Sequence, residues 1–364
     1  MALKRVGILT GGGDCSGLNA VIRAVTRSAI IEYESEVVGI EDGFEGLIFD
    51  RHRMLSIADT KEILPLGGTI LGTTNKGHPF EFREFDKEGH VTIRDYSKQT
   101  LENFKNLKLD CLFVVGGDGT LQIANQFFEM GLPIIGIPKT IDNDLVGTDY
   151  TFGYQTAVQV ACDALDRLHT TGESHQRVMI LEVMGRDAGW IAMEAGIAGR
   201  AHAILIPEIP YQLEKILEKI HLRQERGSPF SIIVVAEGAK EIGKDAITSE
   251  SGSKRLQGVA QLGGVGYHLA HEIGERINLE VRCTVLGHTQ RGGTPLAFDR
   301  VLGTRLGTEA VQAAAQGKFG NMVALHAREI VLVPLKSLAG IVRRVPPDSQ
   351  LVRTAESIGI CLGR

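Results

Sequence analysis

The chain has 364 residues, with 39 Lys or Arg against 44 Asp or Glu, and its formal net charge is −5. A slightly acidic chain without a basic run is a poor candidate for a nucleic-acid binder, and no apolar run approaches the ~18 residues of a membrane span. At roughly 150 residues per domain, the length suggests about two domains. Glycine is the unusual component, because its 44 residues are about 12% of the chain against a usual ~7%.

The amino-terminal residues and the cysteines favour a cytoplasmic protein. The apolar run that follows Lys4 and Arg5 covers only residues 6–9, which is too short for the core of a signal peptide. The five cysteines are scattered and form no C-x-x-C pair. We therefore expect reduced thiols that pack in the interior, and neither disulfides nor a zinc site.

In chain order, short apolar runs alternate with amphipathic stretches. Residues 6–9 form the first predicted strand, a glycine turn follows, and a helical period runs from Leu18 to Ala29. The almost continuously apolar runs indicate strands buried on both faces, and the alternation predicts an α/β fold with mostly parallel sheets covered by helices. The further predicted strands are 37–40, 111–115, 134–137, 178–183, 203–206 and 231–235, the clearest further helices are 154–168 and 211–226, and 238–256 is a predicted surface loop.

The first strand ends in the run Gly11-Gly12-Gly13, and a helix follows. Glycine lets the backbone approach a phosphate closely, and the start of the helix adds a partial positive charge. A tight turn without a ligand is the alternative. The run matches neither G-x-x-x-x-G-K-[ST] nor G-x-G-x-x-G, since Ser16 stands where the third glycine of the latter would be.

A second glycine turn, residues 116–120 (Gly-Gly-Asp-Gly-Thr), follows the predicted strand 111–115. A carboxylate at the centre of a phosphate loop would repel the phosphate unless a cation lies between them. Mg²⁺ held by one or two carboxylates and by substrate phosphates meets that need, which makes Asp118 a candidate metal ligand. The alternative is an aspartate that caps the next helix.

The strand 134–137 leads into residues 138–144 (Pro-Lys-Thr-Ile-Asp-Asn-Asp). One of these carboxylates can accept a proton from a substrate hydroxyl, while the lysine and the threonine can stabilise a phosphoryl group in transfer. A D-N-D turn by itself is usually structural. Three such motifs at successive strand ends point instead to one phosphate site.

The second half of the chain supplies cations beside glycines. Arginine binds phosphate oxygens with two parallel hydrogen bonds, although a single arginine is more often a surface ion pair. His268 and His271 have no third candidate ligand nearby, so we expect an exposed helix face there and no metal site. The candidate anion ligands are Arg177, Arg186, Arg282, His288 and Arg291. The residues alone therefore predict a Mg²⁺-assisted phosphoryl transferase that acts on a small phosphorylated substrate.

Five of these motifs, at 12–14, 116–120, 138–144, 184–186 and 287–293, together resemble the 6-phosphofructokinases of glycolysis. The resemblance implies phosphoryl transfer from ATP to the 1-hydroxyl of fructose 6-phosphate. It also implies two similar three-layer α/β/α domains with the active site between them. Residues 1–153 with about 290–340 would bind ATP and Mg²⁺, and residues 154–289 with about 341–364 would bind fructose 6-phosphate. The family forms homo-oligomers with shared active sites, which implies a homotetramer here, with a dimer as the alternative.

Site residues carry over from the resemblance motif by motif. Asp142 is similar to the base that takes the proton of the sugar hydroxyl, Asp144 would orient the sugar or the metal, and Asp118 would hold Mg²⁺. Thr140 and Arg186 would stabilise the phosphoryl group. The donor would contact Gly12, Gly13, Lys76, Gly117, Gly119, Thr120 and Lys139. The sugar phosphate would contact Thr140, Asp142, Arg177, Met184, Gly185, Arg186, Glu237, Arg282, His288 and Arg291, with Arg177 and Arg282 supplied by a neighbouring subunit.

Several positions depart from the family pattern. Ser16 stands where the first loop often has Pro, which predicts a less rigid turn, and Phe44 stands where many ATP users have Tyr. His202 replaces an acid of the effector site in regulated bacterial members, so regulation by nucleotide or phosphoenolpyruvate is doubtful. The stretch from Glu237 to Arg282 is longer than in the compact bacterial form.

The phosphoryl donor is set by two positions that disagree. Family members that use ATP have Gly after Gly-Gly-Asp and diphosphate users have Asp; here it is Gly119. The residue before Thr-Ile-Asp is usually Gly in ATP users and Lys in diphosphate users; here it is Lys139. Exclusion of a nucleotide by Asp is the stronger determinant, so we predict ATP, with diphosphate or ADP as alternatives.

Two functions of other classes are alternatives to this one. A dinucleotide-dependent oxidoreductase on a similar fold is disfavoured by the broken glycine fingerprint. A catalytically dead sugar-phosphate sensor is disfavoured because Asp118, Asp142 and Arg186 are all present.

Overall fold

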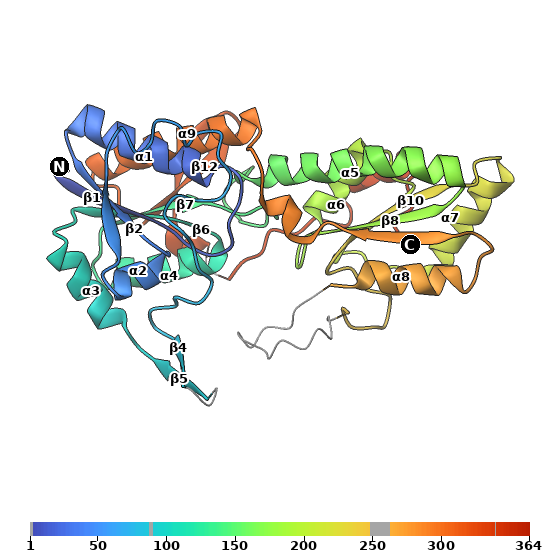
Figure 1. Cartoon of the computed structure of the whole chain (residues 1–364), viewed down its shortest axis with the longest axis horizontal. Coiled ribbons are helices and arrows are strands. Elements are labelled where there is room, and N and C mark those ends of the chain that lie inside the picture. The colour runs from blue at the N-terminus through green and yellow to red at the C-terminus, as the bar shows by residue number, and fades with distance from the viewer. Residues whose placement is uncertain (1–2, 87–89, 248–262, 339) are drawn as a thin grey trace. The chain divides into compact units, whose positions relative to one another are not determined.

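The computed structural model describes residues 3–86, 90–247, 263–338 and 340–364. The chain divides into two compact units (Figure 1). Unit 1 contains Met1–Ile141, Leu145–Gln155 and Arg291–Ile341, and unit 2 contains Asp142–Asp144, Thr156–Gln290 and Val342–Arg364. Which ligand each unit holds stays a prediction.

Unit 1 is built on one seven-stranded sheet with the order β13-β12-β7-β6-β1-β2-β3. The inner pairs are parallel, and only the pairs at the two edges, β2 with β3 and β12 with β13, are antiparallel. The strands are β1 (Arg5–Thr10), β2 (Glu36–Ile40), β3 (His52–Leu55), β6 (Cys111–Gly116), β7 (Ile134–Pro138), β12 (Asn321–His326) and β13 (Glu329–Pro334). The predicted inner strands are confirmed.

The helices of unit 1 cover this sheet. Two of them, α1 and α9, lie side by side (Figure 1) because glycines remove side chains between them. A Cβ at Gly307 would lie 2.7 Å from the Cβ of Ala24, and one at Gly303 would lie 3.2 Å from the carbonyl oxygen of Gly17. The helices are α1 (Leu18–Tyr33), α2 (Phe44–Ile48), α3 (Ser97–Asn106), α4 (Asp118–Glu129) and α9 (Ala297–Ala315), with a 3₁₀ turn, η2 (Leu335–Ser337).

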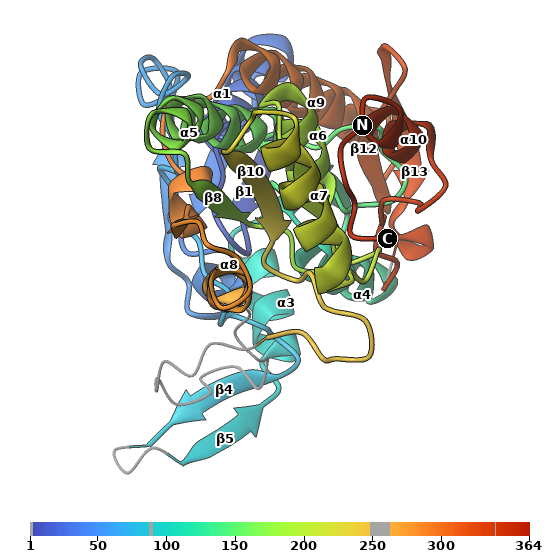
Figure 2. The same cartoon turned by 90° about the vertical axis from the view of Figure 1, so that its right-hand side faces the viewer.

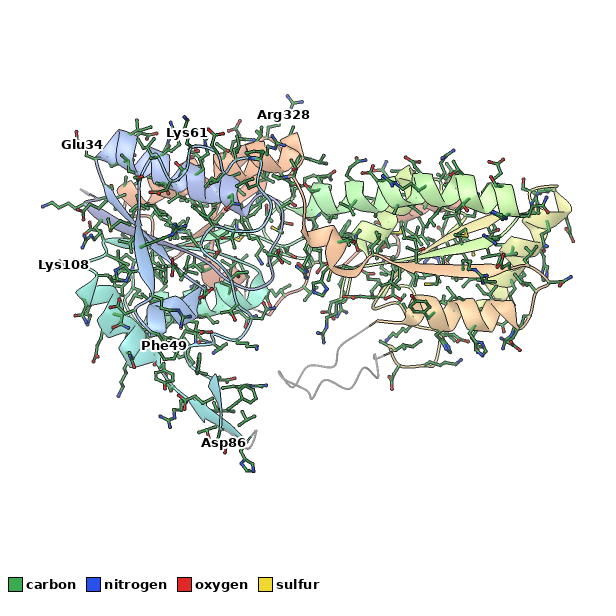
Figure 3. The ribbon with its side chains drawn as sticks, viewed as in Figure 1. Glu34, Phe49, Lys61, Asp86, Lys108 and Arg328 are labelled. Atoms are coloured by element: carbon green, nitrogen blue, oxygen red, sulfur yellow. The ribbon has the colours of Figure 1, made fainter. Side chains whose placement is uncertain are left out.

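A two-stranded antiparallel hairpin, β4 (Phe82–Phe85) with β5 (Val91–Arg94), lies outside the main sheet (Figure 2). Such a pair is marginal by itself in water. Aromatic rings support its base: Phe82 contacts Phe49 and Tyr96 edge-on, with ring centroids 5.4 and 5.5 Å apart. Figure 3 labels Phe49 at this base and Asp86 at the far end of β4.

Unit 2 holds a four-stranded, fully parallel sheet with the order β11-β8-β10-β9. Buried residues of α7 and α8 pack on one face of this sheet, while α5 and α6 cover the other (Figure 1). The strands are β8 (Val178–Val183), β9 (Ala203–Leu205), β10 (Ser231–Ala236) and β11 (Val281–Val285). The helices are α5 (Tyr154–His175), α6 (Trp190–Ala198), α7 (Leu213–Glu225), α8 (Val265–Gly274) and α10 (Gln350–Ser357), with the 3₁₀ turn η1 (Gly287–Arg291).

The mainly parallel α/β fold predicted from the sequence is thus confirmed. The predicted surface loop 238–256 is irregular over 238–247, and its remainder lies outside the described residues. All five cysteines are free thiols, and burial raises the pKa of the Cys15 thiol to about 12, so it stays protonated and inert. Within the part of the chain that the structure describes, no helix is long and apolar enough to cross a membrane.

Candidate active site

Three predicted phosphate motifs of unit 1 follow three neighbouring parallel strands. Thr10 of β1 pairs with Val115 of β6, and Gly116 of β6 pairs with Pro138 of β7. The pairing continues one step beyond the strands, since the Gly11 N–H donates to the Val115 carbonyl at 2.9 Å. The loops at 11–17, 117–120 and 139–141 therefore leave the same edge of one sheet, which is where open α/β sheets bind ligands.

Polar groups from three segments converge on Gly12. This residue has a φ of 79°, and a Cβ placed on it would lie 3.4 Å from Lys139 Nζ, 3.5 Å from Thr120 Oγ1 and 3.8 Å from Asn75 Oδ1. The Lys139 ammonium also donates a hydrogen bond to the Gly13 carbonyl. A glycine backbone with an ammonium, a hydroxyl and an amide around it is a cradle suited to an anionic oxygen.

Two glycines of this region are needed for packing. A Cβ at Gly11 would lie 2.8 Å from the Thr120 side chain, and one at Gly116 only 2.3 Å from it. Thr120 is 9% exposed, so these glycines make room for a buried side chain. Gly119 differs, because it is exposed and no atom lies within 4 Å of a Cβ built there.

Asp118 is the first residue of α4. Its Oδ2 accepts a hydrogen bond of 2.7 Å from Gln122, while its Oδ1 is buried and has no hydrogen-bond partner among the described residues. The capping position of the helix is Gly117, and no side chain caps it. The capping alternative is therefore not supported, and an unsatisfied buried carboxylate oxygen fits a cation.

The structure contains no cluster of three or more metal-binding side chains over its described residues. This agrees with the usual way in which Mg²⁺ is bound beside phosphates. The ion keeps several waters and takes one or two carboxylates together with substrate oxygens. A single aspartate such as Asp118 is enough for this mode.

The segment after β7 passes from one unit to the other. Lys139 and Thr140 belong to unit 1, whereas Asp142 and Asp144 cluster with unit 2. The turn between the two aspartates has Asn143 in the left-handed region, with φ 50°, which asparagine tolerates better than most residues. Inside unit 2 the Arg343 N–H donates to the Asp144 carbonyl at 2.7 Å.

In unit 2 the loops after β8 and β10 pack backbone against backbone. The Gly238 N–H donates to the Gly185 carbonyl at 3.1 Å, and a Cβ at Gly238 would lie only 1.9 Å from the Arg186 carbonyl oxygen. Met184 is held by the buried Gln290 side chain, which accepts its N–H at 2.7 Å. These contacts gather the predicted sugar contacts Met184, Gly185 and Arg186, and the neighbouring Glu237, at one edge of the sheet.

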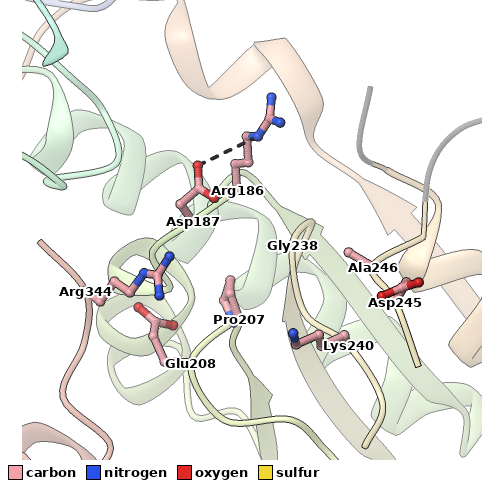
Figure 4. Close-up of a pocket in the computed structure, with 9 residues that line it drawn as sticks. All are labelled: Arg186, Asp187, Pro207, Glu208, Gly238, Lys240, Asp245, Ala246 and Arg344. Carbon is pink, nitrogen blue, oxygen red and sulfur yellow. Dashed lines mark ion pairs between the residues drawn. The ribbon is translucent and has the colours of Figure 1, made fainter. Parts of the chain in front are cut away.

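A cavity of about 360 Å³ opens beside Arg186 (Figure 4). Within it Arg186 faces Asp187 at 3.7 Å, and both side chains are about half exposed. Such a pair contributes little stability, so Arg186 can exchange its partner for a ligand at small cost. The lining residues are Arg186, Asp187, Pro207, Glu208, Gly238, Lys240, Asp245, Ala246 and Arg344.

Glu208 and Arg344 of this cavity were missed from the sequence. The Glu208 carboxylate accepts from the N–H groups of Gly189 at 3.0 Å and Val345 at 2.8 Å, and burial raises its pKa. Glu208 follows β9 closely, so attention to every acid after a predicted strand would have found it. Arg344 comes from the carboxy-terminal segment, where no periodic pattern marked it.

Asn75 was missed as well, whereas the neighbouring Lys76 was predicted as a donor contact and stays a prediction. The Gly12 N–H donates to the Thr74 carbonyl at 3.2 Å, and Thr73 Oγ1 donates to the Gly12 carbonyl at 2.6 Å. This contact lays residues 73–75 along the first glycine loop. Asn75 and Lys76 are both exposed.

Arg177 and Arg282 lie at the other edge of the unit 2 sheet. Arg177 precedes β8, Arg282 is the second residue of β11, and both form ion pairs with Glu280. The seven residue steps from Arg177 to Met184, at ~3.3 Å each, span about 23 Å, while Arg282 pairs with Met179 and lies about 17 Å from Met184 along the sheet. Arg177 and Met184 are therefore too far apart to contact one small sugar phosphate within a single chain.

The remaining predicted residues lie as follows. His288 is exposed in η1, just beyond the carboxyl end of β11. Arg291 belongs to unit 1, where its Nη1 donates to the Asp14 carbonyl at 3.2 Å. His268 and His271 are on α8, half-buried and exposed respectively, as expected for a helix face.

A family model described as Phosphofructokinase matches residues 5–314. The chain belongs to the phosphofructokinase family. The resemblance carried by the five sequence motifs is confirmed.

The chain is similar to relatives that differ in the donor they are named for. It is 51% identical over 361 residues to the ATP-dependent 6-phosphofructokinase of Chloroflexus aggregans, covering 99% of this chain and 98% of that one. It is 49% identical over 344 residues to the pyrophosphate–fructose 6-phosphate 1-phosphotransferase of Amycolatopsis methanolica, covering 94% and 97%.

The fold is similar to that of phosphofructokinase from Pichia pastoris in the T-state, with a TM-score of 0.78 and 31% identity. That comparison covers 93% of this chain but only 38% of the yeast chain, so this chain spans less than half of that one.

Proposed function

We propose that this chain is an ATP-dependent 6-phosphofructokinase, which converts fructose 6-phosphate and ATP to fructose 1,6-bisphosphate and ADP. The observation that carries the proposal is the 51% identity, over nearly the whole of both chains, to a relative named for that activity. The three loops that leave one edge of the unit 1 sheet supply the phosphate-binding groups that such an activity needs.

ATP is favoured as donor by Gly119. A Cβ there would meet no atom within 4 Å, which leaves room for the part of a nucleotide beyond its terminal phosphates. Diphosphate is the second candidate, because Lys139 lies beside Gly12 and a relative 49% identical is named for pyrophosphate. ADP is a third donor to be tested.

The cofactor in this proposal is Mg²⁺, with Asp118 as its protein ligand. The buried Oδ1 of Asp118, which has no hydrogen-bond partner among the described residues, supports this role. When bound, the ion would neutralise charge on the donor phosphates during transfer.

The chemistry assigned to the chain is an in-line displacement. The 1-hydroxyl oxygen of the sugar bonds to the γ-phosphorus of ATP, the bond from that phosphorus to ADP breaks, and the hydroxyl proton passes to Asp142. Thr140, Lys139 and Arg186 would stabilise negative charge on the phosphoryl oxygens, and Asp144 would orient the sugar or the metal.

We also propose that the active site is shared between subunits of a homo-oligomer, a tetramer or a dimer. Arg177 lies about 23 Å from Met184 along β8, and Arg282, beside Met179, lies about 17 Å from it. If all of them contact one sugar phosphate, Arg177 must come from a second copy, and so must Arg282, which shares the partner Glu280 with it. Met184, Gly185 and Glu237 would hold the sugar, while His288 and Arg291 would hold its 6-phosphate. The cytoplasmic location stays a prediction.

The test is product formation by the purified chain with ATP, Mg²⁺ and fructose 6-phosphate, with an aldolase-coupled assay for fructose 1,6-bisphosphate. We expect turnover with fructose 6-phosphate and none with fructose 1-phosphate, which has no free 1-hydroxyl. The matched control is Asp142→Asn, which should lose ~10²–10⁴-fold in kcat while fructose 6-phosphate still binds. Binding without turnover by the wild-type chain, with any donor, would support the sensor alternative.

A further inference from the structure

Ser16 ties the first glycine loop to a distant segment. It is 1% exposed, and its Oγ lies 3.2 Å from the Gly292 carbonyl and 3.1 Å from the Gly293 carbonyl, 276 and 277 residues away. The hydroxyl has one proton, so the two carbonyls share it. Whether the turn is less rigid than one with proline stays a prediction, but the serine supplies a buried hydrogen bond that proline could not make.

Arg291 makes a second tie between the same two segments. Its Nη1 donates to the Asp14 carbonyl at 3.2 Å, and a Cβ on Gly13 would lie only 2.8 Å from that nitrogen. The guanidinium therefore lies directly on the backbone of the first loop. Residues 13–16 and 291–293 form what we call the Arg291 seam.

A neighbouring buried side chain holds a different loop. Asn19, 1% exposed, donates from Nδ2 to the carbonyls of Leu66 at 3.1 Å and Gly67 at 3.2 Å, and its Oδ1 accepts from the Ile70 N–H at 2.9 Å. Asn19 thus anchors the segment that leads toward Asn75, on the donor side. The seam contact of Ser16 is separate from this one.

We propose that Ser16 is a positioning residue for Arg291. Its hydroxyl fixes the peptide groups that directly follow Arg291, and so it holds the guanidinium ready for the 6-phosphate of the sugar. A side chain ordered before binding loses less conformational entropy when the ligand arrives. The inference rests on the proposed function, because it takes Arg291 as a ligand of the sugar phosphate.

The first test is the Michaelis constants of Ser16→Ala. Loss of one hydrogen bond corresponds to about a threefold to tenfold rise in the KM for fructose 6-phosphate, with kcat and the KM for ATP changed less than about twofold. The matched control is Ser28→Ala, which removes another buried hydroxyl of the same region. Ser28 is buried, and among the described residues its Oγ hydrogen-bonds to Glu32 alone, so the KM values of Ser28→Ala should equal those of the wild type. An equal rise in both KM values for Ser16→Ala would overturn the proposal.

The decisive test is a double-mutant cycle with Arg291→Ala. If Ser16 acts through Arg291, Ser16→Ala adds no further loss of fructose 6-phosphate affinity in the Arg291→Ala background. Affinity is measured by calorimetry, so the result does not depend on turnover. Additive losses would show that Ser16 acts on the fold or on the donor loop, and the proposal would be wrong.

Two further measurements keep the outcomes distinct. If Ser16→Ala does not fold, the nearly isosteric Ser16→Cys takes its place, with the same expected KM rise because a thiol is a weak donor. A wild-type chain without fructose 6-phosphate turnover contradicts the proposed function. An active wild-type chain whose Ser16 variants keep the wild-type KM contradicts only the role of Ser16.

Discussion

The Lys139 ammonium donates a hydrogen bond to the carbonyl oxygen of Gly13, 126 residues earlier in the chain. Lys139 is 4% exposed, although lysine is almost never fully buried. The contact joins the loop after β7 to the loop after β1 and leaves the ammonium beside Gly12. Lys139 therefore belongs to the polar groups around Gly12 that we propose bind the donor phosphates, and it is one of the two positions that bear on the choice of donor.

Replacement of Lys139 by glycine should separate the two donors. A diphosphate has no nucleoside to add binding energy, so it depends more on each charge around it than ATP does. We expect Lys139→Gly to lower kcat/KM for diphosphate more than kcat/KM for ATP, measured at saturating fructose 6-phosphate. A larger loss with ATP would contradict this role for Lys139.

Gly119→Asp probes the space that we assign to the nucleotide. The position is exposed and a Cβ there meets no atom within 4 Å, so the free energy of unfolding should change by less than ~0.5 kcal/mol. The added carboxylate would repel the donor phosphates, and we expect kcat/KM for ATP to fall by at least about tenfold. Diphosphate turnover should fall less. An unchanged kcat/KM for ATP would mean that the nucleotide does not pass this position.

A shared active site can be tested by mixing two inactive variants. Asp142→Asn and Arg177→Ala should each be inactive or nearly so alone. After dissociation and random reassembly, about a quarter of the sites combine an intact Asp142 from one copy with an intact Arg177 from another. We therefore expect about a quarter of the wild-type turnover to return. If both residues act within one chain, the mixture stays as inactive as its parts.

His202 should make the protein less stable in mild acid. Its Nδ1 accepts the Ile232 N–H at 2.8 Å and the ring packs on His169 and Phe230; burial first, and then Arg223, lower its pKa to about 3. Below pH ~6.5 the unfolded chain binds a proton that the folded ring refuses. Stability from this group is therefore full above pH ~6.5 and declines as the pH falls toward 3, by at most about 1.4 kcal/mol per pH unit.

The control for this effect is His202→Gln, whose side-chain oxygen can accept the same N–H without titrating. Urea unfolding between pH 4 and 8 should show the wild-type minus variant difference falling as the pH drops. A difference that is constant over this range would remove His202 as the cause.

The inner strands and their ligand loops were predictable because they obey local rules. β1, β6 and β7 are buried on both faces, so each is an unbroken apolar run, and the glycines and polar residues after them mark the carboxyl edge. The edge strand β3 was missed for the opposite reason, because it is partly exposed and its mixed residues show no apolar run. The neighbouring strands β12 and β13 were missed although residues 322–325 and 330–333 are apolar runs, since no glycine-rich ligand loop follows them.

The missed site residues depend on contacts between distant segments. Asn75 reaches Gly12 only because residues 73 and 74 hydrogen-bond to the first loop, and Glu208 is held by N–H groups of Gly189 and Val345. The ties of Ser16 to Gly292 and Gly293 span 276 and 277 residues. Local sequence patterns contain no information about such pairs. For Ser16 the pairing follows from the packing of α1 on α9, which brings the segments that precede these two helices together.

The most direct measurement of the central claim is a comparison of phosphoryl donors on the purified wild-type chain. Initial rates with ATP, diphosphate and ADP, each varied at saturating fructose 6-phosphate and Mg²⁺, give three values of kcat/KM. We predict that the value for ATP is the highest and that it falls to background when Mg²⁺ is chelated. A higher value for diphosphate than for both nucleotides would contradict the assignment of ATP as the donor.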